Sequence, residues 1–240
     1  MRPVFIVAIC CLATFLYSSC GNSHQEERKA TPASSVQPAE SPSAQQPSQQ
    51  EDNRPVVVAF GDSLTQGVSG ESYPAYLQGI LNQNGYRYRV ENQGVSGDTT
   101  SDGLARIENV IAEKPALVIL EFGGNDGLRG IPVEETKKNL DQMIGKLRAA
   151  KIPLALAGIT LPPNYGPDYV KPFTAMYPEL AKKYRLRFLP FLLIHVYDKP
   201  KLMQPDGIHP NEQGNKVIAE DVFELIRPML KQQPAVPQAS

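Results

Sequence analysis

Residues 55–64 read PVVVAFGDSL, an apolar run that ends in Gly61, Asp62 and Ser63. A short apolar run that is rich in valine and closed by glycine predicts a strand buried on both faces, as in parallel sheets. In an open parallel sheet, ligands bind beyond the carboxyl ends of the strands. Ser63 therefore lies where chemistry is expected, although a serine that simply caps a helix is the commoner explanation for such a position.

Outward from this strand, strand-like and helix-like segments alternate along the chain. Further strands are predicted at residues 86–91, 116–120, 153–159 and 186–190. Apolar residues at helical spacing predict helices at residues 73–81, 99–112, 133–150, 173–184 and 212–227. This alternation predicts a three-layer α/β/α fold in which right-handed crossovers connect parallel strands.

The charge of the chain limits the kinds of partner it can have. The 240 residues are 41% hydrophobic and 20% charged, with a formal net charge of -1. These values are ordinary for a globular protein. The near-zero charge excludes a strongly basic nucleic-acid binder, whose affinity depends on neutralising many phosphates. We therefore expect no nucleic acid among the partners.

The first twenty residues have the composition of an export signal. Arg2 precedes an apolar run over residues 4–17, and a Ser-Ser pair then leads to Cys20. An early positive charge, a short apolar core and small residues before a cleavage point predict a secretory signal peptide at residues 1–19. The alternative is an uncleaved N-terminal anchor helix, for which the apolar run is short.

Cys20 resembles the cysteine of the bacterial lipobox, which follows small residues and becomes the acylated N-terminus of a lipoprotein. The resemblance implies lipidation of Cys20 and a membrane-anchored protein that faces the periplasm or the cell exterior. The alternative is plain secretion as a soluble periplasmic protein. All three cysteines lie at or before Cys20, so cleavage there leaves no second cysteine for a structural disulfide.

Residues 20–54 differ from the rest of the chain in composition. They are rich in Ser, Gln and Pro, and Val36 is their only bulky aliphatic residue. Such a segment cannot bury enough apolar area to offset its ordering entropy, so we predict a disordered tether. We expect one folded domain at residues 55–231 and a C-terminal tail at residues 232–240.

Two residues near the C-terminus suit the chemistry that Ser63 needs, because a serine hydroxyl is a weak nucleophile unless a base accepts its proton. His209 lies in a polar turn, and the carboxylate of Asp206, three residues earlier, can hold one ring nitrogen. A capped turn or half of a metal site is the alternative for this pair. His195 lies in the apolar stretch 191–197 and is expected to be a packed or surface histidine. With no further His or Cys in the domain to complete a zinc site, we predict no metal.

Three groups can stabilise the oxyanion that forms when Ser63 attacks a carbonyl carbon. Gly97 lacks a Cβ, so its backbone N–H can approach a ligand closely. Asn125 can offer its side-chain amide, and Ser63 can offer its own backbone N–H. Taken singly, a turn glycine is the favoured explanation for Gly97, and a loop cap is the favoured explanation for Asn125.

Four short motifs occur in order: GDSL at 61–64, SGD at 96–98, GGND at 123–126 and DGIHP at 206–210. This ordered set resembles the SGNH (GDSL-type) hydrolase family over residues 55–230. The segments EFGGNDGLRG (121–130) and LPPNYG (161–166) look like its bacterial thioesterase, lysophospholipase and arylesterase branch. The resemblance implies a flavodoxin-like fold with a five-stranded parallel sheet, and no cofactor.

The resemblance also implies a triad of Ser63, Asp206 and His209, with Ser63, Gly97 and Asn125 forming the oxyanion hole. We therefore expect a serine esterase that hydrolyses aryl esters, lysophospholipids or acyl thioesters through an acyl-Ser63 intermediate. A carbohydrate O-deacetylase on the same fold and a non-catalytic lipoprotein that binds acyl or glycan ligands are the alternatives.

Apolar residues in the long loops beside the predicted site are expected to line the substrate pocket. They are Leu128, Ile131, Leu161 and Tyr165. Ordinary loop packing explains these residues equally well. The expected partners are a small acyl ester or lipid and, through the lipid anchor, a membrane. The sequence carries no signal for the oligomeric state.

Overall fold

The computed structural model describes residues 52–68 and 71–232, all of which lie in the compact unit Gln50–Ser240. The predicted signal peptide with Cys20, the tether up to residue 51 and the tail from residue 233 lie outside the described residues. Within the described part, no helix has the length and apolar composition that crossing a bilayer requires.

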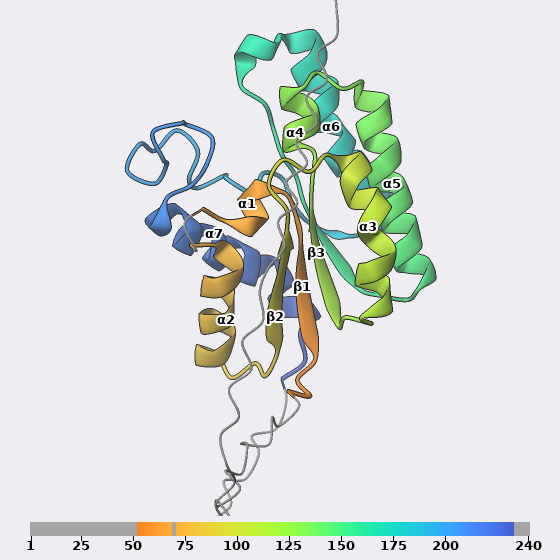
Figure 1. The fold of residues 1–240 in the computed structure, drawn as a ribbon, viewed down its shortest axis with the longest axis vertical. Helices are drawn as coiled ribbons and strands as arrows, with labels where there is room; N and C mark the ends of the chain where they lie inside the picture. Colours follow the sequence, from red (N-terminus) through yellow and green to blue (C-terminus); the bar gives the residue numbers. More distant parts are fainter. Residues whose placement is uncertain (1–51, 69–70, 233–240) are drawn as a thin grey trace, which may run out of the picture. The chain divides into compact units, whose positions relative to one another are not determined.

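A parallel sheet of five strands forms the centre of the domain, in the order β2-β1-β3-β4-β5 (Figure 1). The strands are β1 (Val56–Gly61), β2 (Arg89–Gly94), β3 (Leu117–Glu121), β4 (Leu154–Ala157) and β5 (Arg187–Leu189). The chain passes from β1 to β2 at one edge and then returns to the other side of β1 for β3. Open α/β sheets bind their ligands beyond the strand ends at such a reversal, next to the end of β1.

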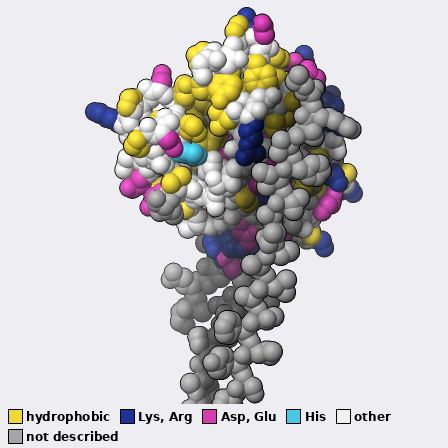
Figure 2. Space-filling model, turned by 45° about the horizontal axis from the view of Figure 1, so that its top comes forward, with side chains coloured by type: hydrophobic (Ala, Val, Ile, Leu, Met, Phe, Trp, Pro, Cys, Tyr) yellow, Lys and Arg dark blue, Asp and Glu magenta, His cyan; other side chains and the backbone are white. Residues whose placement is uncertain are grey.

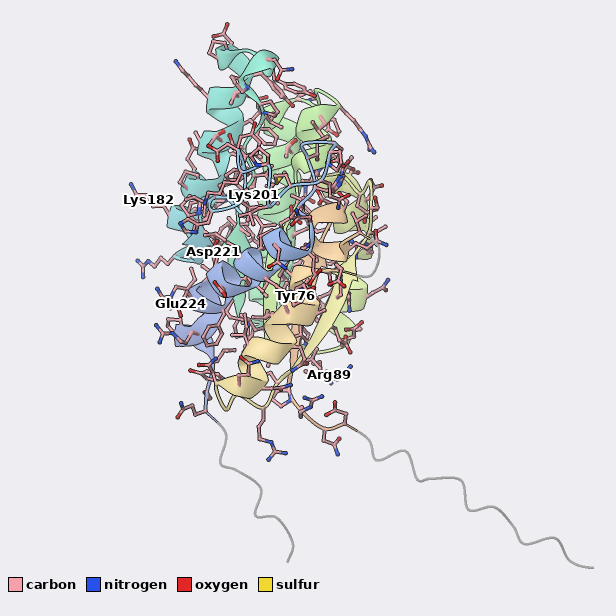
Figure 3. All side chains as sticks on the ribbon, turned by 90° about the vertical axis from the view of Figure 1, so that its left-hand side faces the viewer. Tyr76, Arg89, Lys182, Lys201, Asp221 and Glu224 are labelled. Atoms are coloured by element: carbon pink, nitrogen blue, oxygen red, sulfur yellow. The ribbon has the colours of Figure 1, made fainter. Side chains whose placement is uncertain are left out.

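Helices cover both faces of this sheet. The helices are α1 (Ser63–Gln66), α2 (Tyr73–Gln83), α3 (Thr100–Ala112), α4 (Gly124–Leu128), α5 (Val133–Ala149), α6 (Pro167–Tyr184) and α7 (Glu212–Ile226), with 3-10 turns η1 (Pro163–Tyr165) and η2 (Arg227–Met229). Helices α2 and α7 pack together on one face, as Figure 3 shows, and α3, α5 and α6 cover the other (Figure 1). The predicted three-layer α/β/α flavodoxin-like fold is confirmed.

Apolar side chains of the central strands form the core. Residues 57–60 of β1 are 0% exposed, and residues 117–120 of β3 are 0–2% exposed. Such strands are stable only when helices cover both of their faces, which is why an unbroken apolar run predicts this architecture. Burying each large aliphatic side chain contributes roughly 1.5–3 kcal/mol, so these strands hold the sheet edge above them in place.

The edge strand β2 begins three residues later than expected, at Arg89 instead of Tyr86. Its residues are half-buried and mostly polar, because β2 has a neighbouring strand on one side only. An edge strand of this kind has a weak hydrophobic pattern, and the pattern alone misplaced its start.

Helix α6 also begins earlier than expected, at Pro167 instead of Phe173. A proline in the first helical turn loses no hydrogen bond, because that N–H has no partner in a helix anyway. Pro172 lies inside the helix and removes one backbone hydrogen bond. The buried side chains of Phe173 and Tyr177 compensate by packing into the core.

Candidate active site

Ser63 is the first residue of α1, two residues beyond the last residue of β1. Asp62 caps this short helix, because its carboxylate accepts a hydrogen bond from Leu64 N–H at 3.0 Å. Gly61 is required by close approach, since a Cβ there would lie 2.5 Å from Glu121 Oε2. The strand therefore ends in a tight turn that presents Ser63 at the carboxyl edge of the sheet.

A chain of hydrogen bonds joins the three residues predicted to form a triad. Ser63 Oγ lies 3.0 Å from His209 Nε2, although 146 positions separate the two residues in the sequence. On the other side of the ring, His209 Nδ1 lies 2.7 Å from Asp206 Oδ2. The second oxygen of Asp206 accepts hydrogen bonds from Ile208 N–H at 2.9 Å and from His209 N–H at 3.0 Å.

The carboxyl of Asp206 determines which nitrogen of His209 carries the proton. Partial burial opposes ionisation of Asp206, but hydrogen bonds from His209 and from Ile208 N–H outweigh it and lower the pKa of Asp206 to about 2. An ionised carboxylate can only accept hydrogen bonds, so His209 carries its proton on Nδ1. His209 Nε2 is then free to accept the proton of the Ser63 hydroxyl.

The segment that carries His209 is held by backbone hydrogen bonds. Gln204 N–H donates to His209 O at 2.8 Å, and Gln204 Nε2 donates to Pro210 O at 3.0 Å. Asn211 then caps α7 by accepting a hydrogen bond from Gly214 N–H at 3.1 Å. This support keeps the imidazole within reach of Ser63 and reduces the ordering cost at the moment of reaction.

The loop after β2 lies against the Ser63 turn and carries Gly97. Val95 N–H donates to Gly61 O at 3.1 Å, and the next residue of the loop bonds to the side chain of Gln66. Gly97 has a φ of 84°, a conformation that favours glycine. Within residues 52–68 and 71–232, the backbone N–H groups of Gly97 and Ser63 donate to no protein acceptor, so both are available to an oxyanion.

Asn125 reaches the same edge from α4. The preceding Gly123 has a φ of 122°, and a Cβ there would lie 2.2 Å from the Tyr177 hydroxyl. The Asn125 amide donates to Asp98 O at 3.0 Å and to Asp62 Oδ2 at 3.3 Å. Both amide hydrogens therefore have acceptors, and an oxyanion would draw one of them away from the longer bond to Asp62.

A narrow apolar pocket of about 70 Å³ lies beside the nucleophile, between Leu64 of α1 and Ile208 next to His209. Figure 2 shows apolar side chains gathered on this edge of the domain. Of the predicted pocket residues, Leu128 and Leu161 line it. Two others lie elsewhere: Ile131 and Tyr165.

Much of the remaining pocket wall comes from a segment that the sequence reasoning did not assign to the site. This segment follows β5 and contributes Phe191, Leu193 and Tyr197 to the lining. The Tyr165 hydroxyl instead donates to Leu128 O at 3.4 Å and so contacts the backbone of a residue that lines the pocket. The apolar run directly after a predicted strand was the signal that could have identified this wall.

The second histidine of the domain lies outside the triad. His195 Nδ1 is 2.8 Å from an oxygen of Asp221 on α7, which is labelled in Figure 3. The His195 side chain is 61% exposed, as expected for a surface histidine. The hydrogen bonds between His195 and Asp221 resemble those between His209 and Asp206. Among the described residues, however, no serine is hydrogen-bonded to His195.

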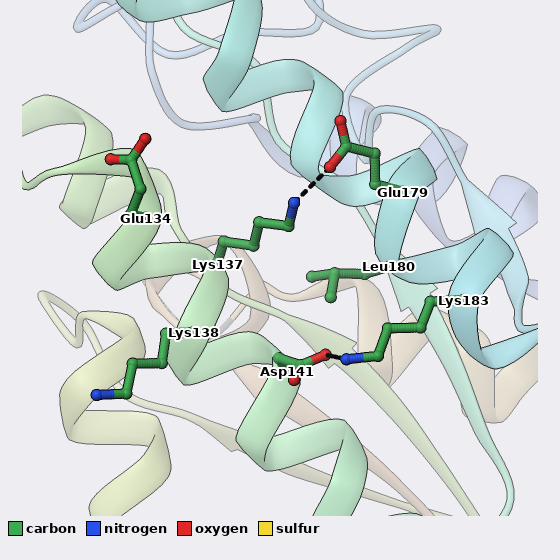
Figure 4. A pocket seen from close by; sticks show the side chains of 7 residues that line it. All are labelled: Glu134, Lys137, Lys138, Asp141, Glu179, Leu180 and Lys183. Atoms are coloured by element: carbon green, nitrogen blue, oxygen red, sulfur yellow. Dashed lines mark hydrogen bonds and ion pairs between the residues drawn. The ribbon is translucent and has the colours of Figure 1, made fainter.

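A wider groove of about 530 Å³ lies between α5 and α6 and is lined mainly by charged side chains (Figure 4). Lys137 pairs with Glu179, and Lys183 Nζ lies 2.6 Å from Asp141 Oδ1, so ion pairs connect the two helices. Exposed pairs of this kind contribute about 0–1 kcal/mol each. None of the predicted catalytic residues lines this groove, and we assign it no chemistry.

Known proteins share both the sequence and the fold of this domain. Residues 59–217 match the GDSL-like Lipase/Acylhydrolase family. Esterase TesA of Pseudomonas aeruginosa is 40% identical over 178 residues, which cover 72% of this chain and 89% of that protein. The Escherichia coli K12 protein named thioesterase 1/protease 1/lysophospholipase L1 is 37% identical over 175 residues, covering 72% of this chain and 84% of that protein.

The structural comparison agrees with the sequence match. A crystal structure of TesA has a TM-score of 0.70 and 41% identity, and it covers 73% of this chain and 99% of that chain. Matches that extend over nearly the whole of these relatives make this chain a member of the GDSL-like lipase/acylhydrolase family.

Proposed function

We propose that this chain hydrolyses esters and thioesters of acyl chains through an acyl-Ser63 intermediate. The observation that carries the proposal is the hydrogen-bonded series Asp206–His209–Ser63, which lies beside an apolar pocket. Membership of the family and relatives named esterase, thioesterase and lysophospholipase support the same chemistry.

In the first step, Ser63 Oγ attacks the carbonyl carbon while His209 Nε2 accepts the hydroxyl proton. The imidazole becomes positively charged, and ionised Asp206 stabilises it without taking the proton. Negative charge then collects on the former carbonyl oxygen. The backbone N–H groups of Ser63 and Gly97 and the amide of Asn125 are the donors available to it.

Collapse of this intermediate breaks the bond between the carbonyl carbon and the leaving oxygen or sulfur. His209 donates its proton to the leaving alcohol or thiol, and the acyl group remains on Ser63. A water molecule then attacks the acyl-Ser63 ester, with His209 as the base. The second collapse releases the carboxylic acid and restores the Ser63 hydroxyl.

The lining of the pocket favours an acyl chain over a sugar. The residues that surround it are almost all apolar, including Leu161, Phe191 and Leu193. A glycan would bury hydroxyl groups there without hydrogen-bond partners, which costs free energy. An acyl chain instead gains about 0.8 kcal/mol for each methylene that it buries.

We expect the octanoyl ester of p-nitrophenol to be hydrolysed with at least about tenfold higher kcat/KM than the acetyl ester. Two additional methylenes in the pocket already contribute about 1.6 kcal/mol, slightly more than a factor of ten. Steady-state rates on the two esters measure this ratio. Leu128→Gln should reduce it, whereas the matched variant Ile131→Gln, outside the pocket lining, should leave it unchanged. A preference for acetyl would support the carbohydrate O-deacetylase alternative instead.

We further propose that the chain is exported and held at a membrane by an acyl group on Cys20. The leader-like composition of residues 1–19 and the lipobox-like position of Cys20 support this proposal. Strand β1 runs from Val56 to Gly61, so the chain enters the domain at the end of the strand opposite to Ser63. An attachment on that side leaves the catalytic edge accessible to substrate.

Labelled palmitate fed to cells that express the full chain should be incorporated into the protein and lost in Cys20→Ala. Only the cysteine at the cleavage point can become the acylated N-terminus. Cys10→Ala and Cys11→Ala are matched controls, because both residues lie within the predicted leader, and they should keep the label. Incorporation that survives Cys20→Ala would contradict the anchor.

A further inference from the structure

A buried glutamate lies directly under the nucleophile turn and has no role in the steps above. Glu121 is the last residue of β3 and is 0% exposed. Its Oε2 accepts hydrogen bonds from Thr65 Oγ1 at 2.9 Å and from Asp62 N–H at 3.4 Å. Its other oxygen, Oε1, has no donor among residues 52–68 and 71–232. A buried carboxylate oxygen without a donor is costly, so this atom requires an explanation.

The neighbour of Glu121 is a second buried carboxyl. Asp62 is 1% exposed, and its backbone N–H donates to Glu121 Oε2 at 3.4 Å, so the two buried carboxyls belong to neighbouring residues at the same turn. The two oxygens of Asp62 already accept from Leu64 N–H and from the Asn125 amide. Two ionised carboxylates repel each other, whereas a single proton between them turns the repulsion into a hydrogen bond.

Glu121 and Asp62, hereafter the carboxyl pair, meet ionisable groups from every element packed around them. These groups are Tyr73 on α2, Arg106 on α3, Asp126 on α4, Tyr177 on α6, and His209. The guanidinium of Arg106 bonds to the Asp98 carboxylate and to backbone oxygens of β1 and β2 instead of the carboxyl pair. A proton is therefore the means by which the carboxyl pair avoids carrying two negative charges.

The acidities of the carboxyl pair agree with this geometry. Burial, together with the charge of Asp62, raises the pKa of Glu121 well above its ordinary value of 4.5. Burial also raises the pKa of Asp62 to about 6, although the Leu64 hydrogen bond and His209 favour its ionised form. Both shifts are upward, so both favour a proton shared within the carboxyl pair, and the shift is larger for Glu121.

We propose that Glu121 is a positioning residue that acts as a neutral acid and shares its proton with Asp62 beneath the Ser63 turn. The protonated oxygen donates to Asp62, while Oε2 accepts from Asp62 N–H and Thr65. Asp62 remains ionised and holds both the N-terminus of α1 and the Asn125 amide. The catalytic consequence of this pair rests on the proposed esterase function, whereas its protonation state does not.

Glu121→Gln in the full chain tests the shared proton, because the glutamine amide donates to Asp62 without ionising. Below about pH 4.5, the folded and the unfolded wild-type chains both hold the Glu121 proton. Above that pH, only the folded chain keeps it, so wild type loses stability relative to Glu121→Gln as the pH rises toward the raised pKa. The ratio of their unfolding equilibrium constants should change by up to tenfold per pH unit, as measured by urea unfolding.

Glu108→Gln on α3 is the matched control, because Glu108 is exposed and lies outside the site. It should keep the pH dependence of wild type. A carboxylic-acid C=O band in infrared spectra at neutral pH, present in wild type and lost in Glu121→Gln, gives an independent signature. Equal pH slopes for wild type and Glu121→Gln, or the absence of that band, would overturn the proposal.

The catalytic side of the proposal requires a second comparison. At neutral pH, Glu121→Gln should keep kcat within about threefold of wild type, whereas Glu121→Leu, which lacks both hydrogen-bonding oxygens, should lose on the order of 10²-fold with little change in KM. A comparable loss in Glu121→Gln would show that an ionised glutamate is needed and would refute the neutral acid. If Glu121→Leu does not fold, the kcat of Glu121→Gln relative to wild type still distinguishes a neutral acid from an ionised glutamate. A wild-type chain without esterase activity would refute the proposed function and leave the unfolding result intact.

Discussion

Replacement of Ser63 by alanine is expected to abolish ester hydrolysis and labelling by a fluorophosphonate. The variant keeps the pocket, the His209 base and the oxyanion donors, but it has no atom that can form the acyl-enzyme bond. Loss of the nucleophile from a triad lowers kcat by on the order of 10⁶-fold, because the remaining members act only through it. Turnover of p-nitrophenyl octanoate by the purified variant measures the effect.

The loss in Ser63→Ala should come from chemistry and not from unfolding. The hydroxyl of Ser63 bonds to His209 at the surface of the site, and the helix cap is supplied by Asp62. The thermal unfolding midpoint should therefore change little. Ser101→Ala, on the exposed side of α3, is the matched control and should retain full activity. Fluorophosphonate labelling of the purified Ser63→Ala protein would refute the assignment.

The central part of this fold could be predicted because its sequence admits few alternatives. Residues 56–60 of β1 and 117–120 of β3 are apolar at every position, and only a doubly covered parallel sheet buries such strands. Parallel strands end at one edge, so polar residues after separate strands must converge there. Ser63, Gly97 and Asn125 meet at that edge for this reason, although they are far apart in the sequence.

Other features depend on contacts that no local pattern records. In the sequence, the pocket wall from Phe191 to Tyr197 is only an apolar stretch around His195, because an apolar run does not reveal which side of it faces a cavity. Glu121 ends an apolar strand and looks like an ordinary surface-facing terminus. Its burial against Asp62 arises from the packing of three elements, so its protonation could not be predicted from sequence.

The oxyanion hole is a further example. The sequence identifies Asn125 as a donor, but it does not show that both of its amide hydrogens already have acceptors. Because the 3.3 Å bond to Asp62 is long, it costs less to exchange than the bond to Asp98. Even so, the negative charge on Asp62 attracts the Asn125 amide and opposes its movement toward the substrate oxyanion. The proton that Glu121 shares with Asp62 reduces this negative charge and so lowers the cost of moving the amide.

Replacement of His209 by alanine is expected to lower kcat by on the order of 10⁵–10⁶-fold on the octanoyl ester, because Ser63 then has no base within reach. Solvent hydroxide becomes the means of removing the serine proton, so the residual rate should rise about tenfold per pH unit. Asp206 cannot substitute, since its carboxylate has a pKa of about 2 and lies behind the ring, away from Ser63. Rates of the His209→Ala variant measured across the pH range test both the size of the loss in kcat and the rise of the residual rate with pH.

The chain supplies its own control for this experiment. His195 also pairs with an aspartate, Asp221, but it is exposed and has no serine beside it among the described residues. His195→Ala should therefore keep wild-type activity and the wild-type pH profile. Because Ser63 and His209 act as one unit, the double variant Ser63→Ala/His209→Ala should be no slower than Ser63→Ala alone. If the losses of the two single variants multiplied, the two residues would act independently, and the triad would be wrong.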